Sequence, residues 1–433
     1  MYTVGLYTLG CKVSQYETEA VAEAFSEIGF DVLNFDDVCD VYVINTCTVT
    51  EESDRKSRQF IRRAVRKNPD AKVIVMGCYS ERAAEEIAKI NGVGAVIGTD
   101  GKLCAPRLAL GLLSGEITAP HIEKLPLADA GFEKMTVRTA PRTRAYVKIE
   151  DGCDSKCTYC AIKMARGRVR SKLPAEVIAE VEALAANGTS EIVLTGIEVA
   201  AYGKDFGEKY GFSDLLLELD KRASCQRVRL GSLAPELIGE KFANTVCQLG
   251  ILVPHFHVSV QSGSNRVLAA MKRRYTRERA LENIERLRKL IPEATFTADI
   301  MVGFPCESDE DFEDTIDFVR RARLLDAHVF AFSRREGTEA YGMVGQVSDD
   351  IKRQRSRRMI EEKNAVRDSL LSDMVARKRV LPCVFESVVG EYYAAHSDTF
   401  VEVRVISDTD VCGKLLEVIP LCHKDGIVYG KIK

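Results

Sequence analysis

The sequence lacks several features that would take it out of the ordinary globular proteins. It has no tryptophan, 12 prolines and 30 glycines among 433 residues, which excludes collagenous, fibrous and mostly disordered chains. No apolar run approaches the roughly 20 residues of a membrane helix, and the first residues, MYTVGLYTLGCK, lack the layout of a signal peptide. We therefore expect a cytoplasmic protein without a membrane partner, built from two or three domains.

Cysteine, by contrast, is abundant. The chain has 14 cysteines, although a long intracellular protein keeps its thiols reduced, so metal ligation is the better explanation for some of them. The net charge of -3 also conceals two basic stretches. Residues 134–172 hold eleven Lys and Arg against three Asp and Glu, and residues 55–67 hold seven against none. These stretches are compatible with an acidic partner.

Residues 1–114 predict an α/β domain with a doubly wound parallel sheet, because short apolar runs alternate with helical periodicity. The expected strands are 4–9, 41–44, 73–76 and 95–97, and the expected helices are 14–27, 53–66 and 80–89. Serines that open the last two helices are predicted N-caps. Residues 115–140, which contain Pro120 and Pro126, are expected to form a linker.

Residues 141–377 repeat the alternation with a longer period, which predicts a complete or partial (β/α) barrel with its active site at the C-terminal ends of the strands. The expected strands are 145–149, 192–194, 228–230, 256–260, 296–301 and 328–332, and the main helices are 175–186, 214–222, 280–290, 309–320 and a basic one at about 350–377. Residues 378–433 contain short alternating strands without helices, which predicts a small all-β barrel.

Cys153, Cys157 and Cys160, which we call the radical triplet, follow the first barrel strand in DGCDSKCTYCAI. Three thiolates can ligate three irons of a 4Fe-4S cluster and leave the fourth iron open, whereas a structural zinc site normally has four protein ligands. Zinc or inert thiols are the alternative. The C-x3-C-x2-C spacing, with Tyr159 before the last cysteine, resembles the radical S-adenosylmethionine enzymes, whose open iron binds S-adenosylmethionine.

The same resemblance implies contacts with the cofactor at later strand ends. Gly196 and Glu198 follow the second barrel strand, where the superfamily contacts the methionine amino group. Each of these signals is weak, because ordinary turn chemistry explains it equally well. The candidate cofactor-binding residues are Tyr159, Gly196, Glu198, Arg229, Ser232, Gln261 and Gly303.

A second set, the auxiliary triplet, lies in the N-terminal domain: Cys11 in LGCK, Cys47 in NTCTVT and Cys78 in MGCY. Each cysteine directly follows an expected strand, at the sheet edge where open α/β sheets bind ligands. A single cysteine at such a place is more simply a small buried hydrophobe. Three at equivalent strand ends predict a second iron-sulfur cluster with one open iron.

With both triplets and the terminal β module, the whole chain resembles the methylthiotransferase family, which has an N-terminal cluster domain, a radical domain and a C-terminal TRAM domain. The segments TLGCKVSQYETEA, LTGIEVAAYG, GFPCESDEDF and HVFAFSRREGTEA carry the resemblance. The first is similar to the branch that modifies N6-threonylcarbamoyladenosine (t6A) next to the anticodon of tRNA. The branches that act on isopentenyladenosine in tRNA and on a ribosomal protein are the alternatives.

The resemblance implies two 4Fe-4S clusters and two uses of S-adenosylmethionine. One molecule methylates a sulfur species attached to the auxiliary cluster. A second, on the radical cluster, yields the radical that takes hydrogen from adenine C2, and methylthio is then transferred to that carbon. Implied partners are an electron donor of the flavodoxin or ferredoxin type and a sulfur source. A non-catalytic electron carrier is a third class, but it would not need such a large barrel.

The sequence departs from the family pattern at three places. Cys306 stands where GFPGE is usual, and Glu150 replaces a common Gln before the radical triplet. Lys163 and Met164 stand where Ile-Pro is typical. None of these changes removes a cluster ligand, but Lys163 and Met164 lie beside the radical triplet and bear on the choice of substrate.

Arg166, Arg168 and Arg170 follow the radical triplet and are the predicted substrate-binding residues, since such groups neutralise phosphates. Together with Lys172 and the basic run 272–275, they indicate a tRNA anticodon stem-loop, whose target base must be unstacked. A solvated surface is the alternative, more strongly so for residues 55–67. Residues 381–433 hold eight acidic and five basic residues, which keeps a protein substrate open.

Overall fold

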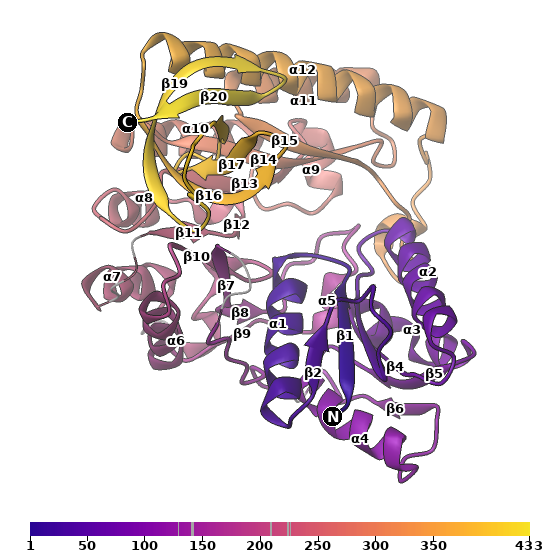
Figure 1. The fold of residues 1–433 in the computed structure, drawn as a ribbon. Helices are drawn as coiled ribbons and strands as arrows, with labels where there is room; N and C mark the ends of the chain where they lie inside the picture. The colour runs from indigo at the N-terminus through magenta and orange to yellow at the C-terminus, as the bar shows by residue number, and fades with distance from the viewer. Residues whose placement is uncertain (129, 140–142, 208–209, 223–224, 226) are drawn as a thin grey trace.

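The computed structural model describes residues 1–128, 130–139, 143–207, 210–222, 225 and 227–433. An N-terminal α/β domain, a central barrel-like domain and a C-terminal β-barrel follow one another along the chain (Figure 1). The long helix α12 (Asp349–Ala376) leads from the central domain to the β-barrel. Within the described residues, no helix combines the length and the apolar character needed to cross a membrane.

The N-terminal domain is a parallel sheet with the strand order β2-β1-β3-β4-β5-β6, which confirms the doubly wound prediction. Its strands are β1 (Thr3–Thr8), β2 (Asp31–Leu33), β3 (Val41–Thr46), β4 (Lys72–Gly77), β5 (Val93–Ile97) and β6 (His121–Glu123), and its helices are α1 (Lys12–Glu27), α2 (Glu51–Lys67), α3 (Cys78–Ala88) and α4 (Ala105–Ser114). β3 is buried along its whole length because helices cover both faces of the sheet. The strand order reverses between β1 and β3, and such switch points are where these sheets bind ligands.

Several details of this domain differ from the prediction, among them β2 and α4, which the sequence did not indicate. The N-cap of α2 is Thr50, whose hydroxyl accepts the backbone N–H of Ser53, and α3 begins at Cys78, so neither Ser53 nor Ser80 is an N-cap. The segment predicted as a linker supplies β6, which extends the sheet beside β5. The predicted domain boundary between residues 140 and 141 lies outside the described residues.

The central domain is a partial barrel of two parallel sheets, with the orders β11-β10-β7 and β12-β13-β14-β15. Its strands are β7 (Arg144–Lys148), β10 (Glu191–Thr195), β11 (Val228–Leu230), β12 (Ser232–Leu233), β13 (His255–Gln261), β14 (Thr295–Val302) and β15 (Asp326–Ala331), and β8 (Glu150–Asp151) pairs with β9 (Arg170–Ser171) beside it. Its helices are α5 (Ile162–Arg166), α6 (Pro174–Ala186), α7 (Phe212–Arg222), α8 (Glu240–Val246), α9 (Asn265–Ala270), α10 (Arg277–Leu290) and α11 (Asp309–Arg321). Short 3-10 turns of this domain are η2 (Val199–Ala201), η3 (Lys204–Phe206), η4 (Pro235–Leu237) and η5 (Glu339–Tyr341), whereas η1 (Lys102–Cys104) precedes α4 in the N-terminal domain. The partial barrel is therefore confirmed.

Successive residues of the barrel strands point to opposite faces of the sheets. One face is apolar and joins the main hydrophobic core beneath the helices, as Val147 of β7 and Leu194 of β10 do. The alternate residues are polar, for example Glu191 of β10 and Asp299 of β14, and they face the inside of the barrel. A barrel with a polar interior requires something to cover its open ends.

The C-terminal strands close into a barrel in the order β16-β17-β18-β20-β19, as predicted. They are β16 (Leu381–Val389), β17 (Tyr392–Ser397), β18 (Glu402–Val405), β19 (Leu415–Lys424) and β20 (Ile427–Ile432). The small barrel contacts the N-terminal ends of the central strands: Thr295 at the start of β14 donates to the carbonyl of Thr399 at 2.7 Å, and Ser190 before β10 donates to that of Gly413 at 2.8 Å. It therefore covers the base of the central barrel, opposite the end where the radical triplet lies.

Candidate active site

The auxiliary triplet gathers at the switch point of the N-terminal sheet. Cys11 is the N-cap of α1, Cys47 follows β3, and Cys78 is the first residue of α3. Cys11 is exposed, Cys47 is half-buried and Cys78 is buried. Burial raises the pKa of Cys78 to about 12, the positive charge of Arg166 opposes the rise, and the neighbouring thiols of Cys47 and Cys11 add to it. The three thiols therefore share one environment, although 67 residues separate the first from the last.

Glycines let the strand ends of the auxiliary triplet come together. Gly10 and Gly77 precede Cys11 and Cys78, and both have a positive φ, of 139° and 102°. A Cβ at Gly10 would lie 3.3 Å from the Cβ of Cys47, and one at Gly77 would collide with the side chain of Asn45. The LGC and MGC patterns of the sequence thus have a steric reason.

The radical triplet lies in the loop between β8 and α5, and each of its sulfurs accepts a hydrogen bond. The backbone N–H groups of Ser155 and Ile162 donate to Cys153 and Cys160, each at 3.4 Å. The guanidinium of Arg273 donates to Cys157 at 3.5 Å and to the carbonyl of Ser259 at 3.0 Å. Burial raises the pKa of Cys160 to about 12, so this thiol needs a metal to become a thiolate at neutral pH.

Both triplets suit iron-sulfur clusters better than single metal ions. Among the residues that the structure describes, no group of three or more His, Cys, Asp or Glu side chains is arranged to hold one metal ion. A cube of iron and sulfur holds its cysteines farther apart than one ion does. Three thiols suit a 4Fe-4S cluster with one open iron, and N–H donors reach all three sulfurs of the radical triplet and that of Cys78 in the auxiliary triplet. The residues present therefore fit the clusters that the sequence predicts.

A buried charge cluster joins the two domains between the triplets. Arg166 at the end of α5 is 1% exposed, and its Nε donates to the sulfur of Cys78 at 3.2 Å. Its Nη1 donates to Glu17 of α1 at 2.9 Å and to Asp151 of β8 at 3.0 Å. Lys148 of β7 belongs to the same group, with ion pairs of 2.9 Å to Glu17 and 2.6 Å to Asp151.

This arrangement contradicts the prediction that Arg166 and Arg170 bind phosphate. Arg170 is also buried, beside Asp151 at 3.6 Å, and Lys172 is buried against Glu180 at 2.5 Å. The sequence prediction failed because it rested on the local run of basic residues alone, whereas the acidic partners of these residues come from other elements. Arg168 is exposed, so its role as a phosphate contact stays a prediction.

Arg273 belongs to a second basic run that the sequence suggested for phosphate contacts, and this interpretation is wrong for Arg273, whereas for the exposed Lys272 and Arg274 it stays a prediction. The side chain is buried against Cys157 and packs on the ring of Tyr275, with its Cζ 5.1 Å from the ring centroid. Each triplet therefore has one buried arginine that donates to one cysteine. Neither role is visible in the sequence, because a lone arginine in a basic run carries no sign of burial.

Two predicted cofactor residues lie beside the radical triplet and around a buried carboxylate. Glu150 accepts the backbone N–H of Glu198 at 2.9 Å, and a Cβ at Gly196 would lie 2.7 Å from the same carboxylate. Glu198 accepts the backbone N–H of Ala234 at 3.0 Å, and burial raises its pKa to about 7. Gly196 thus makes room for Glu150, and Glu198 is the ionisable group of this loop.

Two other predicted cofactor residues make structural contacts, which conflict with a cofactor contact for Arg229 and leave that of Gly303 a prediction. Arg229 is 1% exposed, pairs with Glu191 at 2.8 Å and donates to the carbonyl of Ser397 at 3.0 Å. Its guanidinium therefore joins the barrel interior to the C-terminal barrel, and the predicted contact with the cofactor is wrong. Gly303 makes room for Lys352 of α12, with which a Cβ would collide.

The remaining cofactor candidates have no contact that tests their role. Gln261 ends β13 with a positive φ of 68°, is buried, and its side-chain oxygen has no partner among the described residues, which leaves it free for a ligand. Ser232 begins β12 and is half-buried. Tyr159 packs on the cluster of apolar residues that includes Met271 and Met301. These three assignments stay predictions.

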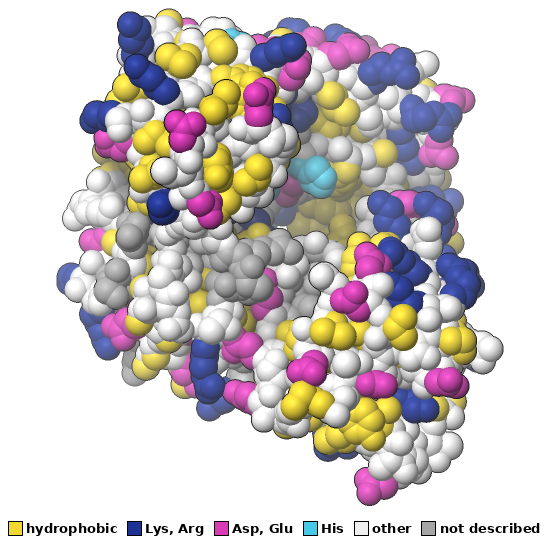
Figure 2. All heavy atoms as spheres, viewed as in Figure 1, with side chains coloured by type: hydrophobic (Ala, Val, Ile, Leu, Met, Phe, Trp, Pro, Cys, Tyr) yellow, Lys and Arg dark blue, Asp and Glu magenta, His cyan; other side chains and the backbone are white. Residues whose placement is uncertain are grey.

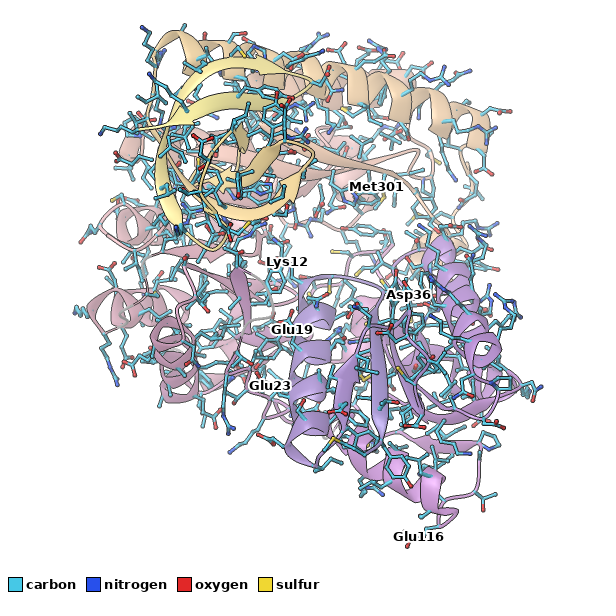
Figure 3. The ribbon with its side chains drawn as sticks, viewed as in Figure 1. Lys12, Glu19, Glu23, Asp36, Glu116 and Met301 are labelled. Carbon is cyan, nitrogen blue, oxygen red and sulfur yellow. The ribbon has the colours of Figure 1, made fainter. Side chains whose placement is uncertain are left out.

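On the face drawn in Figure 2, a hollow lies between the N-terminal domain and the rest of the molecule, and a histidine and apolar side chains are visible inside it. Inside the barrel, Asp299 lies between His257 and His328, at 3.3 and 3.4 Å from their ring nitrogens. Lys12 sits at the end of α1 nearest the central domain (Figure 3). Its backbone end is open to solvent, but desolvation and then the charges of Arg144 and Arg229 lower its pKa, against the opposing effect of Glu191 and Asp299. The charges that act on Lys12 belong to barrel residues, so it faces the central domain, and the sequence analysis missed this residue.

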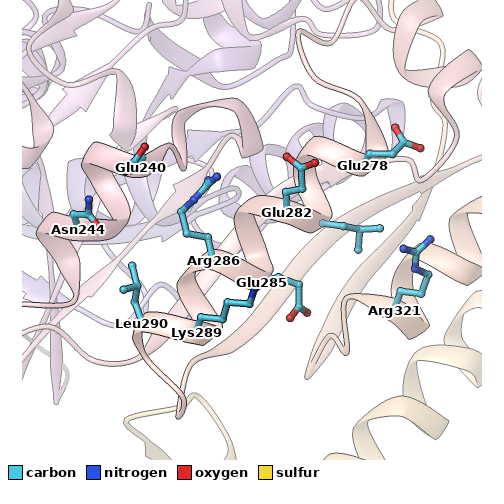
Figure 4. A pocket seen from close by; sticks show the side chains of 10 residues that line it. Glu240, Asn244, Glu278, Glu282, Glu285, Arg286, Lys289, Leu290 and Arg321 are labelled. Carbon is cyan, nitrogen blue, oxygen red and sulfur yellow. The ribbon is translucent and has the colours of Figure 1, made fainter.

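A second concave feature lies away from the cysteines. It is a groove of about 690 Å³ between α8 and α10, lined by both acidic and basic side chains such as Glu240, Glu282 and Arg286 (Figure 4). These helices belong to the outer layer of the central domain, whereas the triplets lie at strand ends. The groove therefore has no part in the candidate site.

Comparison with protein families matches residues 147–319 to the Radical SAM superfamily and residues 3–98 to "Uncharacterized protein family UPF0004". The threonylcarbamoyladenosine tRNA methylthiotransferase MtaB of Bacillus subtilis is 37% identical over 434 residues, which cover 96% of this chain and 93% of that protein. Its namesake in Thermotoga maritima is 35% identical over 100% of this chain and 99% of that protein. A tRNA-2-methylthio-N(6)-dimethylallyladenosine synthase of a Hydrogenobaculum species is 32% identical, with 95% of each chain covered.

Solved structures share the fold at low identity. The radical S-adenosylmethionine methyltransferase TsrM from Kitasatospora setae, with cobalamin and a [4Fe-4S] cluster bound, superposes with a TM-score of 0.58 at 19% identity over 78% of this chain and 77% of that chain. The full-length similarity, the matched domains and the two cysteine triplets agree. The chain therefore belongs to the methylthiotransferase family of radical S-adenosylmethionine enzymes.

Proposed function

We propose that the protein converts t6A next to the anticodon of tRNA into its 2-methylthio derivative, with one iron-sulfur cluster on each triplet. The observation that carries the proposal is the similarity of 35–37% to relatives named for this reaction, over almost the whole chain. The presence of all six cysteines supports the use of two clusters. A radical route suits this target because an aromatic C–H bond offers no acidic proton to a base.

When bound, the clusters and two molecules of S-adenosylmethionine would supply a methyl group and a carbon radical, so that the C2–H bond is replaced by a C2–S bond and the hydrogen leaves on 5′-deoxyadenosine. The sulfur and the electrons would come from a sulfur source and a low-potential donor of the flavodoxin or ferredoxin type. The chain itself holds the cysteines in place, excludes bulk water and orients the adenine.

The hollow between the domains supports t6A over isopentenyladenosine. The threonylcarbamoyl group carries a carboxylate and a hydroxyl, whereas the isopentenyl group is a hydrocarbon. Lys12, directly after Cys11, places a cation at the edge of this hollow, and His257 and His328 add donors on the barrel side. A charged side chain on the substrate suits such a lining better than an apolar one does.

Helix α2 offers a surface for the tRNA backbone. Arg55, Arg58, Gln59, Arg62 and Arg66 line a shallow groove on it. Arg62 and Arg66 are exposed and have no acidic partner among the described residues. Phosphates neutralise such groups and release counterions, so the exposed face of α2 replaces the buried arginines as the expected electrostatic contact.

The test is mass spectrometry of nucleosides from tRNA that carries t6A, after anaerobic incubation with the reconstituted protein, S-adenosylmethionine, a reductant and a sulfur source. We expect a mass gain on t6A equal to the replacement of hydrogen by a methylthio group. If 5′-deoxyadenosine accumulates while t6A stays unchanged, the radical chemistry stands and the substrate is wrong. The same assay with isopentenyladenosine tRNA and then with ribosomal protein identifies which alternative holds.

The Lys12→Met variant tests the choice between the two nucleosides directly. We expect it to lose most of its activity on t6A tRNA and to keep its uncoupled cleavage of S-adenosylmethionine, because only the substrate carboxylate loses its partner. The Lys289→Met variant, which removes an exposed cation on α10, away from the cysteines, is the matched control. Equal losses in both variants would contradict recognition of the carboxylate by Lys12.

A further inference from the structure

The hydrogen bond between Arg166 and Cys78 crosses from one domain to the other. Arg166 belongs to α5, the helix that directly follows the radical triplet, whereas Cys78 belongs to the auxiliary triplet. The Nε to Sγ distance is 3.2 Å. The arginine at the radical triplet differs in this respect, because Arg273 and Cys157 both lie in the central domain.

The direction of the Arg166 guanidinium is fixed on its other sides. Nη1 donates to Glu17 at 2.9 Å and to Asp151 at 3.0 Å, and Nη2 donates to Glu17 at 3.3 Å. One of these carboxylates comes from each domain. Because the guanidinium is planar, two carboxylates at one edge determine where Nε points. Nε therefore reaches Cys78 without freedom to turn away.

The charges around Arg166 do not balance among themselves. Within the described part of the chain, four cations gather here with three carboxylates, namely Lys102, Lys148, Arg166 and Arg170 with Glu17, Glu133 and Asp151. An unpaired buried charge is costly, so such a group needs one more anion. Cys78 is in contact with the group, and as a metal-bound thiolate it would supply that negative charge.

We propose that Arg166 is a positioning residue for the auxiliary cluster, acting through its hydrogen bond to Cys78, and that it makes retention of this cluster depend on docking of the radical domain. The inference rests on the proposed auxiliary cluster. An N–H donor on a ligating sulfur withdraws charge from it, which favours the reduced state of a cluster and raises its reduction potential. Partners of this kind also strengthen metal binding, because their removal lowers the metal affinity about 10- to 100-fold.

The experiment uses the full chain with Cys153, Cys157 and Cys160 all replaced by Ala, so that only the auxiliary triplet can hold iron. After anaerobic reconstitution, iron and sulfide per chain, the rate of iron loss to a chelator, the electron paramagnetic resonance spectrum and the reduction potential are measured. We expect Arg166→Met to lose iron about 10- to 100-fold faster and to shift the potential to more negative values. Arg166→Lys, which keeps the charge, should fall between Arg166→Met and the parent.

Lys148→Met is the matched control, because Lys148 belongs to the same buried group, carries the same charge and contacts Glu17 and Asp151. It should retain iron better than Arg166→Met and leave the potential closer to that of the parent. Equal iron loss and equal potentials in the two variants would overturn the inference and leave Arg166 a purely structural residue. If Arg166→Met does not fold, a reduction potential of Arg166→Lys equal to that of the parent would also overturn the inference. A parent that binds no iron with Arg166 intact would instead contradict the two-cluster function, and the inference with it.

Discussion

Glu198 is the residue of the candidate site with the clearest dependence on pH. Burial raises its pKa to about 7, with the backbone N–H of Ala234 opposing the rise. If it binds the ammonium group of S-adenosylmethionine, only its ionised form does so. We expect the affinity for S-adenosylmethionine to fall about tenfold for each pH unit below this pKa, as measured by anaerobic calorimetry.

The Glu198→Gln variant should bind S-adenosylmethionine more weakly and with little dependence on pH. It should also change stability in a defined direction. A carboxyl whose pKa is raised on folding stabilises the folded state at low pH, and this contribution is lost as the pH rises through about 7. Denaturant unfolding should therefore show that the variant gains stability relative to the parent above that pH. Parallel binding profiles for the two proteins would exclude Glu198 as the pH-dependent group.

The cysteines separate the two halves of the proposed reaction. Cys157→Ala should abolish formation of 5′-deoxyadenosine, because it removes a ligand of the radical triplet. Cys47→Ala should spare that cleavage and stop methylthio transfer, because it affects only the auxiliary triplet. In one reaction, chromatography of 5′-deoxyadenosine measures the cleavage and mass spectrometry of the nucleosides measures methylthio transfer. Formation of the methylthio product by Cys47→Ala at the normal rate would contradict the assignment of two clusters.

Residue identity predicts cysteine sites better than arginine sites, for a physical reason. The cysteines could be placed because each follows an apolar strand, and parallel strands end at a common edge. Arg166 could not, because its burial depends on Glu17 and Asp151, which lie 149 and 15 residues away in the sequence. Arg229 was missed similarly, since its partners include a carbonyl of the C-terminal barrel.

At the level of elements, α2 is the surface on which we expect tRNA to bind. Replacing both Arg62 and Arg66 by Glu should weaken tRNA binding at low salt, since two contacts with phosphate become repulsive. The slope of log affinity against log salt should decrease by roughly one for each arginine, which fluorescence anisotropy over a salt series measures. Cleavage of S-adenosylmethionine without tRNA should be unchanged.

The control for α2 is the same charge change on other helices. Arg279 of α10 and Arg321 of α11 are also exposed, with 53% and 62% of their side chains accessible. Their double replacement by Glu should leave the salt slope intact. If both double variants lose affinity equally, binding depends on net charge alone, and α2 has no special part in it.

Elements were easier to predict than their ends and their docking. Periods of two and of 3.6 residues indicated most strands and helices, since burial of an apolar face imposes them. The start of α3 was misplaced because Cys78 itself is its first residue and Gly77 its cap. β6 was missed because its half-buried edge position requires little apolar character. The C-terminal barrel covers one end of the central barrel through polar contacts. Such contacts leave no periodic pattern in the sequence, so this docking could not be predicted.

At the scale of the whole molecule, Glu191 ties the two barrels together. Burial alone would raise its pKa, but Arg229, Arg227 and Arg144 outweigh burial and lower it to about 2. Glu191→Gln would leave these arginines without their shared anion, and we expect a loss of about 3–5 kcal/mol in unfolding free energy at neutral pH. Urea unfolding followed by circular dichroism measures this loss.

The pH profile of unfolding provides an independent check on Glu191. A carboxyl with a lowered pKa stabilises the folded state at neutral pH, and this contribution disappears as the pH falls toward about 2. The difference between parent and Glu191→Gln should therefore shrink in acid. A constant difference at every pH would mean that the substitution acts through packing instead of charge.

The unequal exposure of the auxiliary triplet has a consequence for how the protein matures in the cell. Cys78 is covered by Arg166, whereas Cys11 stays open to solvent. A carrier protein that delivers iron and sulfur can therefore reach Cys11 first, and Cys78 only before the radical domain closes over it. We expect maturation to follow an order, with the auxiliary metal inserted while the two domains are still apart.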